Sequence, residues 1–273
     1  MLGVHAVANN RTGRAARPLA LAPPSDRIAT MEIAMLADFA LGGALRRTTG
    51  PDHPLPTVTL DLQLTGEVRS ASQLVTWPSS TVAIEGGLGS ATASIEEGDV
   101  VLGQCSALFS VSPSATRVAP LPWDVDTEGE ATSTGEEQLT LAERNLVGLI
   151  SGHAGTSGSR SWSESLIESL FAPRAAGEAR RSVTPEAFMT NRGGFLQGGV
   201  LFAVAAHAAL EGGGDALRLA SGHIEFISSA MPAAELTVSV EPLHETRRTV
   251  FTRAFVHQDG RLVANASFVA RRR

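Results

Sequence analysis

The sequence contains almost no cysteine, the residue that builds disulfides and many metal sites. It has one cysteine, Cys105, among its 273 residues, which excludes an internal disulfide and disfavours a cysteine-based metal site. Cys105 lies in the strand-like segment VVLGQCSALFSV, and we interpret it as a small core residue. The seven histidines show no metal-ligand spacing, and His207 is expected in the core of an apolar helix. We therefore expect neither a metal nor a redox cofactor.

The chain also lacks a basic excess and long apolar runs. Its 22 Lys and Arg residues against 28 Asp and Glu give a net charge of −6, unlike a nucleic-acid-binding protein. We interpret the basic run at 271–273 as a solvated end. No apolar run reaches the length of about 18 residues that predicts a membrane span, and the N-terminal segment lacks the apolar centre of a secretory signal. These absences predict a cytoplasmic protein without a nucleic-acid partner.

What the sequence does contain is a faint internal repeat. Apolar helices are expected at 31–47 and 198–210, and each is followed by alternating segments typical of antiparallel strands. Each copy closes with a hairpin signal, Gly98-Asp99 in the first and Asp259-Gly260 in the second. The segments that correspond in the two copies are 57–68 with 221–232, 72–77 with 234–240, and 80–111 with 248–270.

This repeat predicts the fold class. An antiparallel sheet buries one face, and a helix that is apolar nearly all round must be covered on most sides. We expect an α+β fold with two domains in one chain, each an antiparallel β-sheet wrapped around a central α-helix. The expected domains are 1–123 and 161–273, joined by a linker at 124–160 that carries a short helix. A further helix is expected at 162–171.

The most specific motif is NRGGFLQGGV, which runs from Asn191 directly into the second apolar helix. Adjacent glycines at the start of a helix weaken it relative to alanine. Gly198 and Gly199 therefore indicate that another group must approach the bare backbone closely. The free N–H groups and the dipole of a helix N-terminus favour negative charge at that point.

This motif resembles that of tandem hotdog proteins of the PaaI-like acyl-CoA thioesterase group. The family pattern is Asn-x-x-Gly-x-x-His-Gly-Gly followed by the central helix, and here Gln197 stands in place of the histidine. The family also carries an acidic residue about two and a half turns into that helix. In the second half this position is Ala206, whereas in the first half it is Asp38.

The two halves lack complementary parts of the family site. The first half has the acid, but Ala29-Thr30-Met31 replaces the glycine turn. The second half has the glycine turn but lacks the acid. In hotdog dimers the active site takes each part from a different subunit, so the resemblance implies one composite site in a fused chain.

The residues themselves support these roles. Asp38 lies on an apolar helix with no Lys or Arg at i±3 or i±4, so the carboxylate needs donors from elsewhere. Desolvation would make it a stronger base. Gly198 N–H is expected to polarise the thioester carbonyl. The alternative for Asp38 is a position on the solvent-facing stripe of its helix. The alternative for the two glycines is a tight turn that serves packing alone.

Five further residues complete the expected site. Asn191 could hold the attacking water or the thioester carbonyl, or could simply close an Asx turn. Thr59 stands where related thioesterases often carry a hydroxyl bonded to the nucleophilic water. Gln197 contacts substrate or braces the turn. Gly194 and Gly199 are expected to line the substrate.

We therefore expect an acyl-CoA thioesterase with no cofactor, and possible homo-oligomers of double-hotdog units. Asp38 would act as general base or as nucleophile, and the sequence leaves both open. One alternative is a non-catalytic module that binds acyl-CoA or an acyl-carrier protein. The other is a hotdog hydratase or dehydratase, which would need a catalytic histidine.

Overall fold

The computed structural model describes residues 5–9, 12–16, 30–50, 52–66, 75–77, 79–97, 99–111, 117–118, 141, 144, 148, 162–173, 180–211 and 217–272. Its helices are α1 (Thr30–Thr49), α3 (Trp162–Leu170) and α4 (Gly198–Leu210), with a 3-10 turn at Ala187–Met189. The strands are β1 (His5–Asn9), β2 (Thr12–Ala16), β3 (Thr57–Leu64), β4 (Val75–Trp77), β5 (Ser79–Glu85), β6 (Leu88–Glu97), β7 (Val100–Ser110), β8 (Arg180–Val183), β9 (Leu217–Phe226), β10 (Leu236–Glu245), β11 (Thr249–Gln258) and β12 (Arg261–Arg272).

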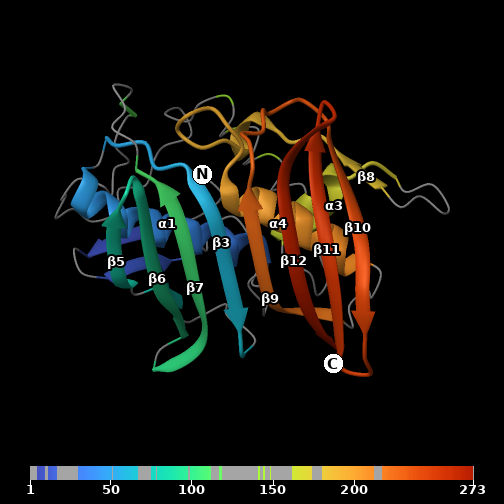
Figure 1. Cartoon of the computed structure of the whole chain (residues 1–273), viewed down its shortest axis with the longest axis horizontal. Helices are drawn as coiled ribbons and strands as arrows, with labels where there is room; N and C mark the ends of the chain where they lie inside the picture. The colour runs from blue at the N-terminus through green and yellow to red at the C-terminus, as the bar shows by residue number, and fades with distance from the viewer. Residues whose placement is uncertain are drawn as a thin grey trace.

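These strands form one 12-stranded sheet in the order β1-β2-β4-β6-β7-β3-β9-β12-β11-β10-β8, with β5 also paired to β6. The strand order is symmetric about the β3–β9 pair at the centre of the sheet. β3, β7, β6 and β4 in the first half correspond to β9, β12, β11 and β10 in the second. This symmetry is the structural form of the sequence repeat, and it confirms the predicted α+β architecture of two hotdog units (Figure 1).

The two halves join edge to edge at the centre of the sheet. β3 pairs antiparallel with β9, from Thr59 opposite Glu225 to Gln63 opposite Ser221. The sheet therefore continues across the boundary between the halves. Of the predicted linker at 124–160, only residues 141, 144 and 148 are described, all of them helical. The remainder of this linker lies outside the described residues.

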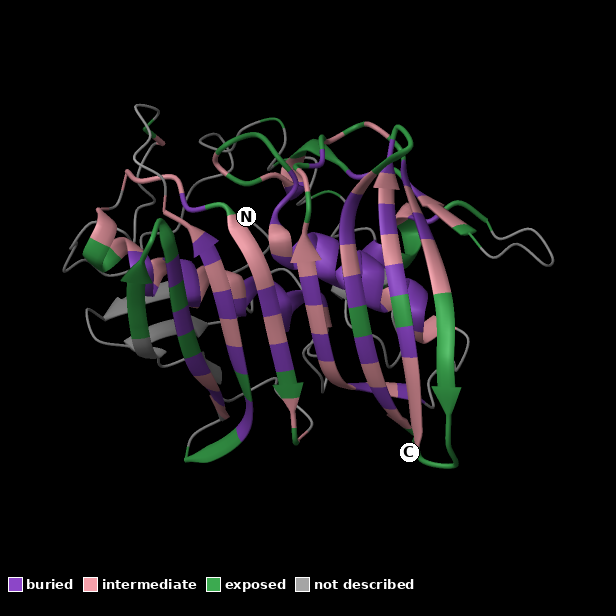
Figure 2. Ribbon diagram, in the orientation of Figure 1, coloured by how far each residue is buried: buried purple, intermediate pink, exposed green. Residues whose placement is uncertain are grey.

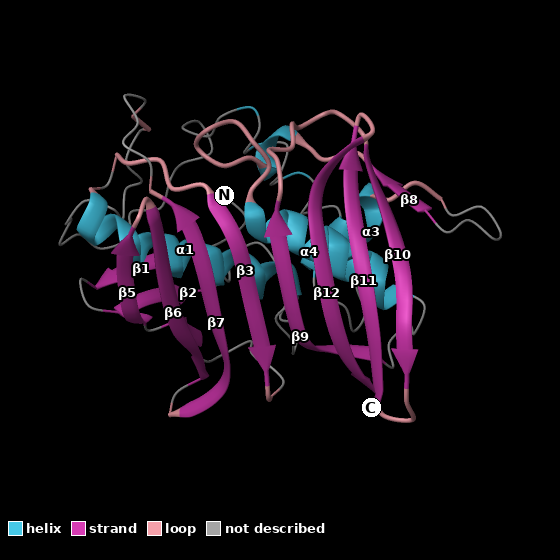
Figure 3. Cartoon of the chain, in the orientation of Figure 1, coloured by secondary structure: helices cyan, strands magenta, loops and turns pink. Residues whose placement is uncertain are grey.

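The helices lie together on one face of the curved sheet (Figure 3). Gly199 at the start of α4 packs directly on α1, because a Cβ atom built on Gly199 would lie 2.5 Å from the Met35 nitrogen and 2.6 Å from its Cα. Almost every α4 residue from Gly199 to Ala209 is buried. An apolar helix without a polar face thus finds cover on the sheet side and on the α1 side.

Burial alternates along the central strands, as a sheet with one covered face requires (Figure 2). Cys105 on β7 is buried in this core, as predicted, and burial raises the pKa of its thiol to about 12. His207 is less enclosed than predicted: it is half-buried and its ring stacks on Phe171 at 5.0 Å between centroids. The Asp259-Gly260 turn joins β11 to β12 with positive φ at both residues, as the hairpin signal indicates. Gly98 lies outside the described residues.

Candidate active site

Asp38 brings the two halves of the chain together. Its side chain leaves α1 in the first half, and its Oδ2 accepts a hydrogen bond of 2.6 Å from Nε2 of Gln197 in the second half. Its other oxygen, Oδ1, accepts a bond of 2.8 Å from the Thr57 hydroxyl at the start of β3. The carboxylate thus obtains from elsewhere in the fold the donors that its own helix lacks.

Gln197 is the N-cap of α4 and is only 5% exposed. Its Oε1 accepts a 3.0 Å bond from the backbone N–H of Val200. This bond determines which end of the amide faces which neighbour, because the reverse orientation would place N–H against N–H and oxygen against carboxylate. The cap of one half therefore presents its NH₂ group to the acid of the other half.

Gly198, the first residue of α4, lies beside the carboxylate. A Cβ atom built on it would lie 3.4 Å from Asp38 Oδ2 and 3.2 Å from Cζ of the Phe226 ring. No described residue accepts a hydrogen bond from the Gly198 N–H. The missing side chain of Gly198 leaves room beside Asp38, and its N–H belongs to the positive end of the helix dipole.

Thr57, rather than Thr59, is the threonine that reaches Asp38, and a β-bulge is the reason. Between β3 and β7 the register shifts, so that Thr57 lies opposite Phe109 while Thr59 lies opposite Leu108. Phe109 points into the core, and Thr57 shares its face. Thr59 shares the outer face with Glu225, its partner on β9. The structure therefore places Thr59 on the solvent side, contrary to the predicted role.

The resemblance to related thioesterases pointed to Thr59, and strict alternation, which puts residues 57 and 59 on the same face, could not separate the two threonines. The extra residue of a bulge reverses that alternation locally. A hydroxyl residue at the first position of the strand after the acidic helix was the available signal.

The electrostatics of Asp38 reflect its enclosure. Burial of the carboxyl raises its pKa, while the bond from Thr57, the positive charge of Arg46 and the bond from Gln197 act in the opposite direction. A carboxylate with a raised pKa binds a proton more strongly than one in water. The arrangement can hold an ionised acid that is a better base than an exposed aspartate.

The other predicted residues lie in the turn before α4. The Oδ1 of Asn191 accepts bonds from the N–H groups of Gly193 at 2.8 Å and Phe195 at 3.3 Å, which is the Asx-turn alternative. Gly194 adopts a φ of 79° in the same turn. Gly199 faces the α1 backbone, so packing explains its missing side chain. None of these three bonds to Asp38, whose hydrogen bonds come from Thr57 and Gln197.

The position on α4 that corresponds to Asp38 is Ala206, which carries no acid and is fully buried. Across the described part of the chain, no three His, Cys, Asp or Glu residues are grouped so that they could hold a metal ion. Within the same residues, no helix combines the length and the apolar character needed to cross a bilayer.

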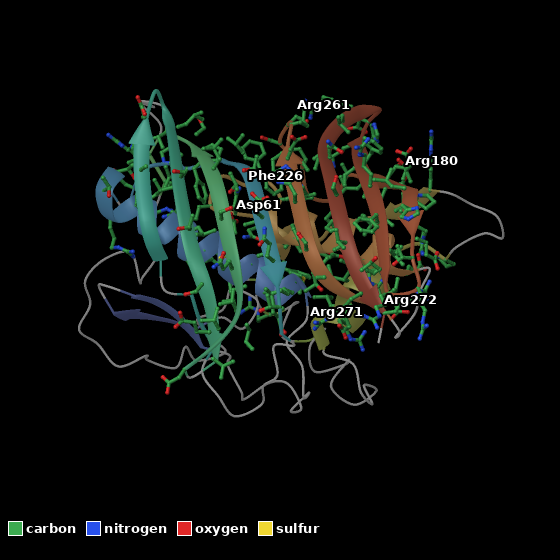
Figure 4. All side chains as sticks on the ribbon, turned by 60° about the horizontal axis from the view of Figure 1, so that its bottom comes forward. Asp61, Arg180, Phe226, Arg261, Arg271 and Arg272 are labelled. Carbon is green, nitrogen blue, oxygen red and sulfur yellow. The ribbon has the colours of Figure 1, made fainter. Side chains whose placement is uncertain are left out.

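Figure 4 shows the two sides of the central seam, with Asp61 on β3 and Phe226 on β9. Asp61 belongs to the outer face, where its Oδ1 lies 2.7 Å from Nδ1 of His223 across the seam. Phe226 belongs to the inner face, because its ring lies against Gly198. The candidate site is therefore on the helix side of the sheet, and the nearest strand histidine is on the opposite side.

Comparison with known proteins matches this region to a thioesterase family. Residues 188–271 match the model of the acyl-CoA thioesterase N-terminal domain. The matched segment includes Gln197, Gly198 and Phe226, and it supports a thioester hydrolase. No curated protein sequence matches the chain.

Solved structures with a similar fold extend over both halves. The tesB protein of Mycobacterium avium subs paratuberculosis has a TM-score of 0.63 at 13% identity, and the alignment covers 100% of this chain and 96% of that one. A Lactobacillus plantarum protein assigned as an oleoyl thioesterase has a TM-score of 0.61 at 12% identity, with 100% and 99% covered. The 12:0-ACP thioesterase of Umbellularia californica has a TM-score of 0.57 at 8% identity, with 99% and 96% covered. These likenesses establish the hotdog fold of the whole chain.

Proposed function

We propose that this protein hydrolyses acyl-CoA thioesters at one composite site between its two hotdog halves. The observation that carries the proposal is the position of the Asp38 carboxylate. It is held by Thr57 and by Gln197 of the other half, beside Gly198, the first residue of α4. A base and an oxyanion donor at one point are what thioester hydrolysis needs.

The proposed reaction proceeds through a tetrahedral intermediate. The thioester carbonyl accepts a hydrogen bond from Gly198 N–H, and Asp38 removes a proton from a water as the water oxygen attacks the carbonyl carbon. The negative charge that forms on the carbonyl oxygen lies at the N-terminus of α4, where the helix dipole stabilises it. Collapse breaks the carbon–sulfur bond, and the leaving thiolate receives the proton from Asp38. The products are a carboxylic acid and CoA.

Both oxygens of Asp38 already accept a hydrogen bond, and we write the reaction with Asp38 as the general base. The bonds from Thr57 and Gln197 stabilise negative charge on the carboxylate and reduce its basicity and its nucleophilicity alike, so an experiment must separate the two routes. A single turnover in ¹⁸O-labelled water tests for an anhydride that water opens at Asp38. The general-base route labels the released acid and leaves Asp38 unlabelled. Attack by Asp38, followed by opening of the anhydride at the Asp38 carboxyl carbon, would label Asp38 and release an unlabelled acid.

The rival functions make different demands on the same site. A hydratase would need a histidine at the acid, and the described partners of Asp38 are Thr57, Gln197 and Arg46. A non-catalytic binding module would release no CoA from any acyl-CoA. An acyl-carrier protein could carry the acyl group in place of CoA. Supplying the same acyl groups on acyl-carrier protein and measuring their hydrolysis tests this.

The deciding experiment measures CoA release from short, medium, long and aromatic acyl-CoAs. We expect Asp38→Asn to reduce kcat/KM by about 10²–10⁴-fold, the usual contribution of a general base. Asp61→Asn is the matched control, because Asp61 is a carboxylate on the outer face of β3. Equal activity of the wild type and Asp38→Asn, or no hydrolysis of any substrate, would overturn the proposal.

A further inference from the structure

A glycine and an arginine follow Asp38 along the same stripe of α1. Asp38, Gly42 and Arg46 are spaced at i, i+4 and i+8, so they lie one above another on the helix surface. A Cβ atom built on Gly42 would lie 3.5 Å from Nη1 of Arg46 and 3.7 Å from its Nη2. The guanidinium group of Arg46 therefore lies over Gly42, one turn from Asp38.

The direction of the Arg46 side chain follows from helix geometry. The rise of the helix separates the backbones of residues 38 and 46 by about 12 Å. Long side chains on a helix lean toward its N-terminus, over the preceding turn. Arg46 therefore extends back toward Asp38, and its charge at Gly42 is roughly half that distance from the carboxylate.

The space above Gly42 is limited on its other side by the core. Cε1 of Phe109 lies 3.6 Å from the same Cβ position on Gly42. A branched side chain at position 42 would take the space that the guanidinium group occupies. The position tolerates a Cβ atom in ordinary van der Waals contact and excludes larger side chains.

Among the described residues, the other printed contacts of Asp38 and Gly198 come from groups that carry no charge. Thr57 comes from β3, Gln197 from the cap of α4, and Phe226 from β9 on the far side of Gly198. None of these three titrates in the range of a carboxyl group. The field of Arg46 lowers the pKa of Asp38, against the effect of burial.

We propose that Arg46, laid over Gly42, is a positioning residue that keeps Asp38 in its carboxylate form for the hydrolysis proposed above. The bonds from Thr57 and Gln197 orient the carboxylate, and Arg46 supplies the charge that the apolar surroundings lack. Gly42 belongs to the same device, because it provides the path along which the guanidinium group approaches.

The test compares two neighbouring arginines. We would measure the pH profile of kcat/KM for the wild type, Arg46→Met, Arg46→Lys and Arg47→Met. We expect the acid limb to move to higher pH in Arg46→Met, to return toward the wild type in Arg46→Lys, and to stay in place in Arg47→Met, because Arg47 is exposed. Coincident profiles for Arg46→Met and Arg47→Met would overturn the proposal.

Two neighbouring glycines provide a second matched pair. A Cβ atom on Gly43 would meet nothing within 4 Å, so Gly43→Val changes the helix without displacing Arg46. We expect Gly42→Val to reproduce the shifted acid limb of Arg46→Met and Gly43→Val to keep the wild-type profile. A wild-type profile in a folded Gly42→Val variant would remove Gly42 from the proposed device.

A readout that needs no substrate separates this inference from the proposed hydrolysis. The ¹³C chemical shift of the Asp38 carboxyl, assigned with Asp38→Asn, reports its titration in the wild type, Arg46→Met and Arg47→Met. A titration moved to higher pH only in Arg46→Met supports the role of Arg46 even if no acyl-CoA is hydrolysed. An unmoved titration in Arg46→Met refutes that role even if hydrolysis is fast.

Discussion

At the scale of single residues, the candidate chemistry depends on one carboxylate whose supports come from different parts of the chain. Thr57 contributes from the strand that follows α1, and Gln197 contributes from the N-cap of α4, which is 159 residues after Asp38 in the sequence. Each donor serves one oxygen of Asp38. Removal of either donor leaves the base in place but weakens its ionised form.

Thr57→Val and Thr59→Val form a pair that tests the β-bulge. Thr57→Val removes the hydroxyl that bonds Asp38 Oδ1 at 2.8 Å. A hydrogen bond to a charged group is worth about 1.5–3 kcal/mol, so we expect kcat/KM to fall by about tenfold or more. Thr59→Val acts on the outer face, and its kinetics should match the wild type. If only Thr59→Val were impaired, Thr59 rather than Thr57 would be the threonine that supports Asp38.

Asp38→Asn should make the protein more stable at neutral pH even as it removes activity. Because burial raises the pKa of Asp38, the folded state holds this proton more tightly than the unfolded state. Its stabilising effect is complete below the unfolded pKa and is lost as the pH rises through the folded pKa. Asparagine removes that loss and can still bond Gln197 and Thr57. We expect a higher urea midpoint for Asp38→Asn than for the wild type at pH 7, and a difference that shrinks as the pH is lowered toward 4. A lower midpoint for Asp38→Asn at pH 7 would contradict this.

The resemblance to tandem hotdog proteins predicted that Asp38 would lie near the glycine turn that contains Gly198, and Asp38 lies beside Gly198 in the structure. The sequence was insufficient for Thr57, because a bulge is a local change of register that composition does not mark. It also could not decide between two uses of Asn191, and the described bonds are those of an Asx turn. The assigned catalytic roles of these residues stay predictions.

At the scale of secondary-structure elements, the two glycines at the start of α4 have different tasks. Gly198 faces Asp38 and the Phe226 ring, whereas Gly199 faces the backbone of α1 at Met35. Sequence alone treated both as part of a ligand site, since a close approach by another helix and by a substrate both favour glycine. The helix boundary itself was predictable, and α4 begins at Gly198 and ends at Leu210 as expected.

Gly199→Ala should separate α1 from α4. Its methyl group would lie 2.5 Å from the Met35 nitrogen and 2.8 Å from the Ala34 carbonyl carbon, and backbone atoms cannot rotate away. We expect a loss of about 1–3 kcal/mol of unfolding free energy, the usual cost of overpacking. Gly43→Ala is the control in open space, where alanine should stabilise α1 by up to about 1 kcal/mol. Urea unfolding followed by circular dichroism measures both, and equal stability of the two variants would argue against the close helix contact.

At the scale of the whole molecule, the β3–β9 seam sets the geometry of the site. Backbone pairing from Thr59 to Gln63 fixes the position of one half relative to the other. On the outer face, the Asp61–His223 contact of 2.7 Å crosses the same seam. On the inner face, the Gln197–Asp38 bond also joins the two halves. A fused chain keeps these halves at a fixed effective concentration.

The difference between the two halves, in which one has the acid and the other has the glycine turn, predicts one ligand per chain. The pseudo-equivalent of the Asp38 position is Ala206, which is fully buried in α4. The pseudo-equivalent of the glycine turn, at the start of α1, carries Met31, whose side chain is buried and 2% exposed. This second location offers neither a carboxylate nor a bare helix N-terminus to a thioester. Isothermal titration with a non-hydrolysable thioether analogue of the best acyl-CoA should therefore give a stoichiometry near one per chain. A value near two would mean that both halves bind acyl-CoA independently, and binding at the Met31 location could then be removed without change in hydrolysis.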